Sequence, residues 1–394
     1  MKKARYRALL TFEGCCYLVI AGFIMAGAMA RQINLLMILF GLLAGGFLVH
    51  WRLVSKMVRK IDVQRKLPAA ISSGDLLVVE LLGTNRRRRL GAWAIEAVDT
   101  IVREAPAGPD AATAGRALFS YLPARDETRT TYRGRLYLRG RYRFGPLELS
   151  SRFPLGLLRY RATIDLPDTL YVYPRVGHLT LAWRRWQEGL ESSGGKSSPR
   201  RGMLEGDFFG LRDWRHGDSR RWLHWRTSAR RQTPVVRQFE QPRDQGLAIA
   251  LDLWQAGPLE TAEEDAVELA ISLVATIVAD ACRAGGRHIS IAAAGREPWS
   301  ISGPASTALM DDVMSRLATC EPHAADALPR ALAQLLENLR RGTQVLVIGP
   351  RAVNLEHDPR FHAVRKDGRL SKWLSKLKTV DTSAPSLNEL FVVS

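Results

Sequence analysis

Two long apolar runs stand at the start of the chain. Ala8–Ala30 and Ile33–Val49 are each almost free of polar residues, and Arg31–Gln32 separates them. The polar exceptions are Thr11, Glu13 and Asn34. Each run extends to about twenty residues, the length that a helix needs to cross the hydrocarbon core of a bilayer. The pattern therefore predicts a transmembrane helical hairpin within residues 1–55.

A signal peptide is the alternative for the first run, because basic residues precede it. Its cleavage would leave a second hydrophobic span immediately behind, which favours the hairpin. The flanking basic residues are Lys2, Lys3, Arg5 and Arg7 before the runs, and Arg52, Lys56, Arg59, Lys60, Arg65 and Lys66 after them. The turn carries only Arg31. By the positive-inside rule we expect a two-pass protein of the cell inner membrane, with both termini and the main domains in the cytoplasm.

Between residues 60 and 185 the apolar runs become short and regularly spaced. The predicted strands are Leu76–Leu82, Trp93–Val102, Arg135–Arg139, Arg141–Phe144, Leu147–Leu149 and Leu170–Tyr173. Arg135–Arg139 has the cleanest alternation and is bounded by Gly134 and Gly140. Many short strands separated by Gly and Pro predict a β-sandwich.

Residues 246–394 show a different alternation, of strands with longer amphipathic segments. Predicted strands are Gly246–Leu253, His288–Ala293, Thr343–Gly349 and Leu390–Val393; predicted helices are Glu260–Arg283, Pro304–Thr319 and Asp326–Arg341. Alternation of this kind predicts a parallel sheet with helices on its faces.

The stretch between these domains, residues 186–245, is rich in charge and tryptophan. It opens on a Gly-Lys-Ser fragment, Ser192–Ser198, that lacks the first glycine of a phosphate-binding loop, so we interpret it as a linker. Between Arg200 and Arg243 there are eleven Arg and five acidic residues, together with three Trp and two His. Trp222 and Trp225 are three residues apart, which predicts that they share one helix face, with Asp218 as the N-cap.

Three roles are open for this stretch. Alternating Arg and Asp with Trp suit an ordered ion-pair network that locks the segment onto a neighbouring domain. They equally suit a partner-binding surface, because Arg and Trp are enriched at interface hot spots. The third possibility is a ligand site.

Composition limits the function further. The 394-residue chain has a net charge of +18, which suits an anionic membrane surface or a nucleic acid. Since a membrane hairpin accounts for much of this charge and no nucleic-acid-binding motif is present, we expect no nucleic-acid partner. The four cysteines form no CxxC or CxxH spacing, so the sequence predicts neither a zinc site nor a disulfide framework.

The run Gly210–Asp218, followed by Arg221–Trp225 and Ala229–Arg230, resembles the signature of the domain-of-unknown-function 58 family. In words, that signature is G-x-R-x-[YW]-x-x-G-D, R-x-[IL]-x-W and A-R. The positions that carry it are Arg212, Trp214, Gly217, Asp218, Arg221, Trp222, Trp225, Ala229 and Arg230. The preceding domain also resembles the family, but Arg152–Leu155 stands where the family commonly has an Asp-Pro-Phe run.

The resemblance implies a von Willebrand factor A-like domain at the C-terminal end. Metal-binding domains of that type have D-x-S-x-S after the first strand. Here Asp252 is followed by Trp254 and Ala256 at the two hydroxyl positions. Hard cations require several oxygen ligands. We therefore expect no metal here: Asp252 is the remnant of a degenerate site, left to cap the backbone or to pair with an Arg of the signature.

The family resemblance also implies a partner, a MoxR-type AAA+ ATPase. We therefore expect a membrane-anchored cytosolic scaffold or adaptor in protein assembly or in stress and envelope functions, without a cofactor. One alternative is a membrane protein that binds nucleic acid or another anionic ligand. A second is an uncharacterised hydrolase that uses a His–carboxylate pair among Asp213, His216, Asp218 and His224. Because the sequence has no nucleophile elbow and no HExxH motif, we expect no enzymatic activity.

Overall fold

The structure is a computed structural model. It describes residues 4–106, 112–185, 201–202, 208–215, 218, 220–240, 246–255, 261–324, 327–337, 339, 343–353, 361, 377–384 and 387–392. The chain divides into two compact units, Met1–Arg175 with Met314–Cys320, and Val176–Val313 with Glu321–Ser394. The Gly-Lys-Ser fragment and Gly217 lie outside the described residues.

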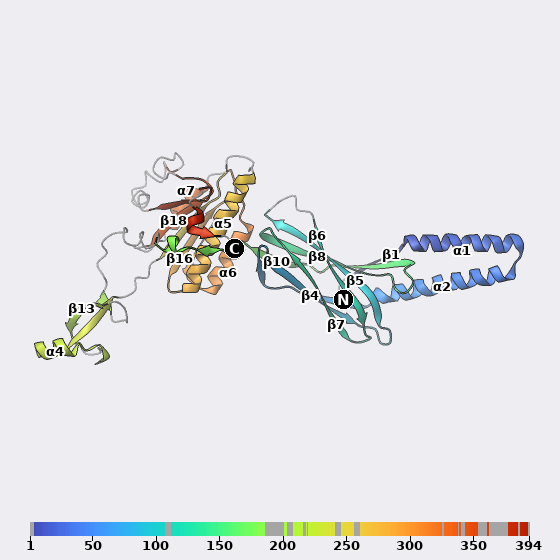
Figure 1. Ribbon diagram of the computed structural model, residues 1–394, viewed down its shortest axis with the longest axis horizontal. Helices are drawn as coiled ribbons and strands as arrows, with labels where there is room; N and C mark the ends of the chain where they lie inside the picture. Colours follow the sequence, from blue (N-terminus) through green and yellow to red (C-terminus); the bar gives the residue numbers. More distant parts are fainter. Residues whose placement is uncertain are drawn as a thin grey trace. The chain divides into compact units, whose positions relative to one another are not determined.

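The first unit contains two long antiparallel helices, α1 (Phe12–Arg31) and α2 (Asn34–Val58), which lie side by side (Figure 1). Both are long and apolar enough to cross a membrane, which confirms the two predicted apolar helices. Their boundaries differ from the prediction. Residues 8–10 belong to strand β1 (Ala4–Leu10), because the backbone there pairs with another strand. Helix α2 continues to Val58, because its last turns pack into the core of the adjoining domain.

The strands of the first unit form two sheets. They are β2 (Ile61–Lys66), β3 (Ala70–Ser72), β4 (Leu76–Asn85), β5 (Ala92–Ala105), β6 (Thr113–Leu122), β7 (Glu127–Arg135), β8 (Gly140–Ser151), β9 (Leu158–Ile164) and β10 (Asp168–Tyr173). One sheet contains β1-β9-β8-β10-β3 together with β5 and β6, and the other contains β2-β4-β7. One hydrophobic core takes side chains from both sheets, which is the two-layer packing expected of a β-sandwich.

One predicted strand is absent. Strand β7 ends at Arg135, and the segment 136–139 connects it to β8. Tyr137 and Leu138 are both exposed, at 63% and 49%, so the alternating sequence does not have the alternating burial of a strand. Strand β8 begins at Gly140, where φ is +152°.

A buried ion pair ties the two sheets together. Arg65 on β2 and Asp99 on β5 are fully buried and form two hydrogen bonds of 2.5 and 2.7 Å. Tyr132 on β7 donates to the same carboxylate at 2.7 Å. Burial and the neighbouring Asp99 charge raise the pKa of the Tyr132 hydroxyl, which therefore stays protonated and remains a donor.

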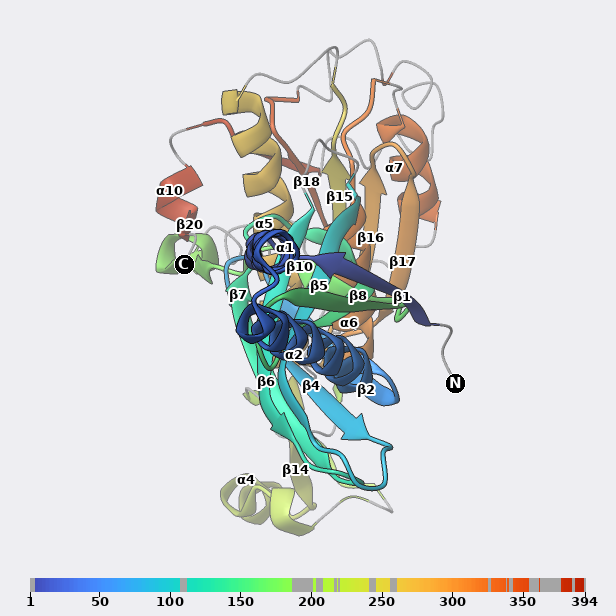
Figure 2. The same cartoon turned by 90° about the vertical axis from the view of Figure 1, so that its right-hand side faces the viewer.

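The main sheet of the second unit has five strands. They are β15 (Leu247–Asp252), β16 (His288–Ala294), β17 (Trp299–Pro304), β18 (Gln344–Gly349) and β19 (Lys378–Asp381). The order is β17-β16-β15-β18-β19, and only β17 is antiparallel to its neighbour (Figure 2). The structure confirms the predicted strand–helix alternation. It adds β17 and β19, and it places β20 (Phe391–Val392) in a separate pair with β11 (His178–Leu179).

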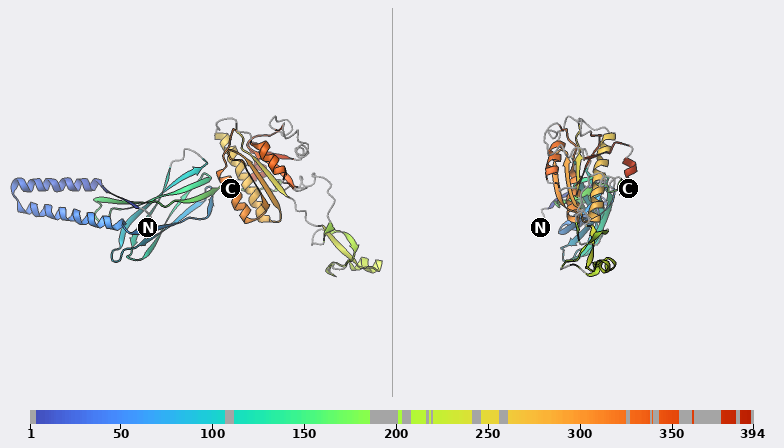
Figure 3. Two further views of the ribbon diagram at one scale, coloured as in Figure 1. Left: turned by 180° about the vertical axis from the view of Figure 1, so that it is seen from behind. Right: turned by 90° about the vertical axis from the view of Figure 1, so that its left-hand side faces the viewer.

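Helices cover both faces of this sheet. Helix α5 (Thr261–Ala284) lies against one face and α7 (Leu328–Glu337) against the other (Figure 3). Helix α6 (Thr307–Thr319) follows β17 in the sequence, and its residues from Met314 belong to the first unit. The side chains of α7 pack on one alternating set of strand residues that includes Ala248, Ala292 and Val347. From β15 the chain continues to β16 on one side, and it later returns to β18 on the other side of β15. The strand order therefore reverses between β15 and β18, and we call the carboxyl ends of these two strands the switch point.

Candidate functional site

The family signature lies on a β-hairpin with a helical connection, residues 208–240, which we term the signature arm. Strand β13 (Phe208–Asp213) pairs antiparallel with β14 (Val235–Glu240), and the short β12 (Arg201–Gly202) pairs with β14 on the other side. Between β13 and β14 lie a 3-10 turn, η1 (Arg220–Trp222), and helix α4 (Trp225–Arg231).

An Arg–Asp pair closes the connection of the signature arm. Both guanidinium nitrogens of Arg212 donate to the Asp218 carboxylate, at 2.6 and 2.7 Å. The Arg215 backbone N–H donates to the same carboxylate at 2.8 Å. These hydrogen bonds, above all those from Arg212, hold the pKa of Asp218 below its ordinary value. Asp218 is therefore a fixed anion that folds the chain after β13 into a turn.

A second set of contacts seats helix α4 on β14. The His224 imidazole caps the helix by accepting from the Thr227 N–H at 3.3 Å. The Ser228 hydroxyl accepts from the Val235 N–H at 2.9 Å, and the His224 N–H donates to the Val235 carbonyl at 2.8 Å. Val235 and Val236 are almost fully buried. The start of α4 is thus fixed to the first residues of β14.

Two sequence predictions for the signature are wrong. Asp218 is not a helix N-cap, because its carboxylate bonds Arg212 and the Arg215 amide, and His224 caps α4 instead. Trp222 and Trp225 do not share a helix face, because Trp222 ends η1 and Trp225 begins α4. The spacing of the two Trp residues does not reveal that the helical conformation is interrupted at Leu223, which forms a β-bridge with Val236.

The remaining signature residues differ in exposure. Trp214 and Trp222 are half-buried, whereas Trp225 is 72% exposed. Ala229 and Arg230 are also exposed on α4, and Arg221 contributes backbone to η1. The structure therefore brings Arg212 and Asp218 into direct contact and leaves Trp225 and Arg230 facing solvent.

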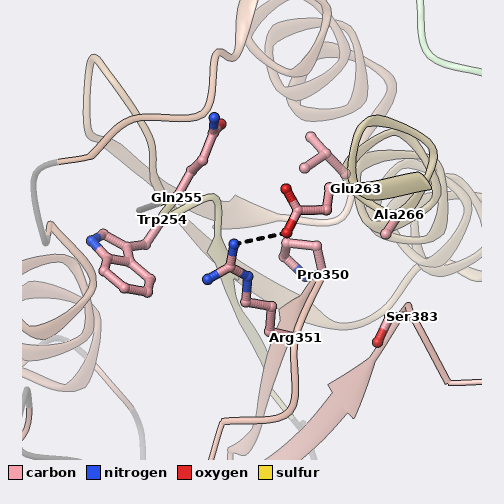
Figure 4. A pocket seen from close by; sticks show the side chains of 8 residues that line it. Trp254, Gln255, Glu263, Ala266, Pro350, Arg351 and Ser383 are labelled. Carbon is pink, nitrogen blue, oxygen red and sulfur yellow. Dashed lines mark hydrogen bonds and ion pairs between the residues drawn. The ribbon is translucent and has the colours of Figure 1, made fainter. Parts of the chain in front are cut away.

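A separate pocket of about 250 Å³ lies at the carboxyl ends of β15, β18 and β19 (Figure 4). It is lined by Trp254, Gln255, Glu263, Ala266, Val267, Pro350, Arg351 and Ser383. The Arg351 guanidinium lies over the Trp254 ring, 5.5 Å from its centroid, and donates to Glu263 at 3.2 Å. In sheets of this connectivity, ligands bind where the chain reverses direction. Sequence reasoning missed Arg351 and Glu263, which no motif marks.

Asp252, at the end of β15, serves as a backbone cap, as one of the two sequence alternatives proposed. Its carboxylate accepts from the Trp254 N–H at 3.1 Å, and the residue is only 4% exposed. Among the described residues, no group of three or more His, Cys, Asp or Glu side chains is arranged to hold a metal ion. The aromatic and guanidinium groups of Trp254 and Arg351 are no ligands for a hard cation.

These features define a class of two-unit protein. A β-strand domain with two apolar helices is followed in the sequence by an α/β domain, whose pocket lies at the carboxyl ends of its central strands. Residues 210–367 match the family described as "Protein of unknown function DUF58". The match covers the signature arm from Gly210, four of the five strands of the main sheet (β15 to β18) and every pocket residue except Ser383. The match supports the DUF58 family, which the signature residues predict.

A relative supports this assignment. The chain is 26% identical over 249 residues to the uncharacterized protein YeaD of Bacillus subtilis (strain 168). The matched region is 62% of this chain and 58% of the relative, so the chain spans little more than half the length of that relative.

Two solved structures have weak similarity, each at 10% identity. One is a chain from the complex of zinc 2-glycoprotein with prolactin inducible protein from human seminal plasma, with a TM-score of 0.17, covering 29% of this chain and 97% of that one. The other is Spo0M, a sporulation control protein of Bacillus subtilis, with a TM-score of 0.18, covering 37% and 61%. At such TM-scores, neither match defines a shared arrangement of domains.

Proposed function

We propose that this protein is a membrane-anchored cytosolic scaffold or adaptor whose signature arm binds a MoxR-type AAA+ ATPase at the inner membrane. The observation that carries the proposal is the surface of α4. Trp225 is 72% exposed there, and Arg226, Arg230 and Arg231 are exposed beside it. An exposed Trp flanked by Arg is the composition of an interface hot spot. The positive charge fits an acidic surface on the partner.

The contacts beneath this surface support a binding role. Arg212 and Asp218 fix the turn before α4, and Ser228 fixes α4 to β14. A surface that is already ordered loses less conformational entropy when it binds a partner. The ion-pair network and the partner surface, which the sequence analysis gave as alternatives, then occur together in the signature arm: the network holds the surface in place.

The arrangement of the second unit supports a non-enzymatic, von Willebrand factor A-like role. In the five-stranded sheet, ordered β17-β16-β15-β18-β19, the first strand in sequence, β15, is central. The third, β17, is an edge strand that runs antiparallel to β16. Beyond the end of β15, where a domain of that type would hold its metal, the Arg351 guanidinium lies over the Trp254 ring. Asp218 and His224, both candidates for a hydrolase, are engaged in structural hydrogen bonds.

Co-purification tests the proposal. The 394-residue chain in detergent is mixed with a MoxR-type AAA+ ATPase of the same genome, with and without ATP, and the captured ATPase is measured. Since hot-spot truncation costs at least about 2 kcal/mol, we expect Trp225→Ala to weaken capture by about 30-fold. The matched control is Tyr137→Ala, which removes an exposed ring from the first unit and leaves capture unchanged.

Three results separate the alternatives. Nucleotide-dependent capture that Trp225→Ala weakens to this extent, in a variant with unchanged melting, supports the adaptor role. Equal capture by both variants would remove the signature arm from the interface. If the ATPase does not bind, salt-dependent binding of generic DNA by the wild type, lost in Trp225→Ala, would favour the nucleic-acid alternative.

A further inference from the structure

An exposed aromatic cluster lies on the β-strand domain of the first unit. The Trp93 ring packs against Tyr121 at 4.2 Å and against Phe153 at 6.0 Å between ring centroids. The three residues are 45%, 40% and 37% exposed, and Leu155 is 55% exposed in the same segment as Phe153. Large apolar side chains that gather on a surface mark an interaction site, whereas single ones do not.

The segment that carries Phe153 and Leu155 is bonded to both helices of the hairpin. At its end, the Leu157 carbonyl accepts from the Thr11 N–H at 3.1 Å, and the Gly156 carbonyl accepts from the Thr11 hydroxyl at 2.8 Å. On the other side, the Leu158 N–H donates to His50 of α2 at 3.1 Å. A side chain at Gly14 would collide with the Leu157 carbonyl, so α1 approaches this segment as closely as its backbone allows.

The length of α1 sets the depth of the segment. Its 20 residues extend about 30 Å at 1.5 Å per residue, which is the thickness of a bilayer's hydrocarbon core. With the turn at Gln32 at one boundary, Phe12 lies at the other. The cluster is attached at Thr11, the residue before Phe12, and is therefore at the level of the headgroups. Trp51, next to His50 on α2, is 52% exposed and reaches the same level.

The composition of the cluster fits that level. Trp and Tyr are enriched at membrane–water interfaces, because their rings are apolar and their N–H and O–H groups remain hydrated. Arg152 is exposed and directly precedes Phe153, and the exposed Arg88 and Arg89 precede Leu90, which is itself 40% exposed. Guanidinium groups bind phosphate oxygens by charge-assisted hydrogen bonds. A bilayer with anionic phospholipids offers both an interface for the aromatic rings and phosphate groups for the guanidinium groups.

We infer that Trp93, Tyr121, Phe153 and Leu155, with Arg152, form a second membrane contact seated in the headgroup interface of an anionic bilayer. The inference rests on the hairpin crossing the membrane, as the proposed function requires. A helical hairpin alone can tilt in the bilayer together with the domain that is packed on it. A second contact at the base of the hairpin holds the β-strand domain at a fixed inclination to the bilayer.

Fluorescence quenching by brominated lipids tests this contact. The full-length chain is reconstituted in vesicles of phosphatidylglycerol and phosphatidylethanolamine with bromine near the carbonyl end of the acyl chains. The emission of one Trp is obtained as the difference between wild type and a Trp→Phe variant. Trp93→Phe reports the cluster and keeps an aromatic ring against Tyr121. Trp51→Phe reports the hairpin, and Trp225→Phe reports an exposed Trp outside the first unit.

We expect the Trp93 and Trp51 emission to be largely quenched and the Trp225 emission to be unchanged. Quenching of Trp51 without quenching of Trp93 would overturn the second contact and leave the membrane anchor intact. If neither is quenched, the hairpin does not cross the bilayer, and the anchor and the second contact both fail. As a check on the lipid class, replacing phosphatidylglycerol by phosphatidylcholine, or Arg152 by Ser, should reduce the Trp93 quenching.

Discussion

Arg212 and Asp218 form a bidentate ion pair, at 2.6 and 2.7 Å, that joins the end of β13 to the turn before η1. The two are six positions apart along the chain. Asp218 has a side-chain exposure of 4% and Arg212 of 24%, so the guanidinium is the more exposed partner of the pair. The G-x-R-x-[YW]-x-x-G-D spacing thus encodes a turn held by one guanidinium and one carboxylate.

Breaking this pair should loosen the signature arm without unfolding the chain. In Asp218→Asn the charge is lost and one of the two Arg212 hydrogen bonds has no acceptor. We expect the arm to lose about 1 to 3 kcal/mol of local stability. Hydrogen exchange of the Val235 and Val236 amides measures it. The matched control, Arg237→Lys, changes an exposed Arg on β14 and should leave this exchange unchanged; equal protection in Asp218→Asn would contradict the structural role.

The same pair gives the arm a dependence on acid. Because the folded-state pKa of Asp218 is lowered, its contribution to stability is complete above the unfolded-state pKa of about 3.9 and is lost as pH falls through the lower folded-state value. We expect arm protection, corrected for intrinsic exchange, to decrease below about pH 4. Asp218→Asn should lack this part of the pH dependence, and identical profiles for the two proteins would disprove the assignment.

Removing the buried anion of the first unit should cost far more. Asp99→Ala leaves the fully buried Arg65 with only Asp168 as a charged partner and leaves Tyr132 without its acceptor. We expect a loss of about 3 to 5 kcal/mol in chemical denaturation, against about 1 kcal/mol for Tyr132→Phe. The exposed Arg86–Asp62 pair is the control, and Arg86→Ala should cost under about 1 kcal/mol. Comparable losses for Asp99→Ala and Arg86→Ala would show that burial does not matter here.

The pocket of the second unit should not bind magnesium through Asp252. Its carboxylate accepts from the Trp254 amide, and the Arg351 cation lies over the Trp254 ring nearby. Calorimetric titration of the full-length chain with magnesium chloride should give the same isotherm for wild type and Asp252→Asn, a variant of nearly the same shape. An Asp252-dependent binding isotherm would reverse this interpretation of the site.

Much of the architecture follows from local patterns that act over a few residues. Runs of apolar residues of membrane length predict α1 and α2, and strand–helix alternation predicts the sheet around β15. Such predictions succeed because burying an apolar face stabilises any sequence of the right period. The signature spacing also predicted the family whose model matches residues 210–367, because its Arg, Trp, Gly and Asp positions are fixed along the chain.

Tertiary contacts decided the features that periodicity does not encode. Ala8–Leu10 is as apolar as the helix that follows, yet β9 supplies a partner strand and the segment becomes β1. Tyr137 and Leu138 alternate like a strand, but the chain leaves the ladder at Arg135. Trp222 and Trp225 have helical spacing, and the bridge from Leu223 to Val236 separates them.

The sites show the same division. The sequence alone indicated that Arg212 and Asp218 belong together in one motif, and that Asp252 is followed by Trp254 and Ala256 and not by hydroxyl residues. It gave no reason to place Arg351 over Trp254, or Trp93 beside Phe153, because 97 and 60 residues separate these partners along the chain. Their proximity results from strand order and backbone pairing, which depend on long-range hydrogen bonds and core packing that no local period records.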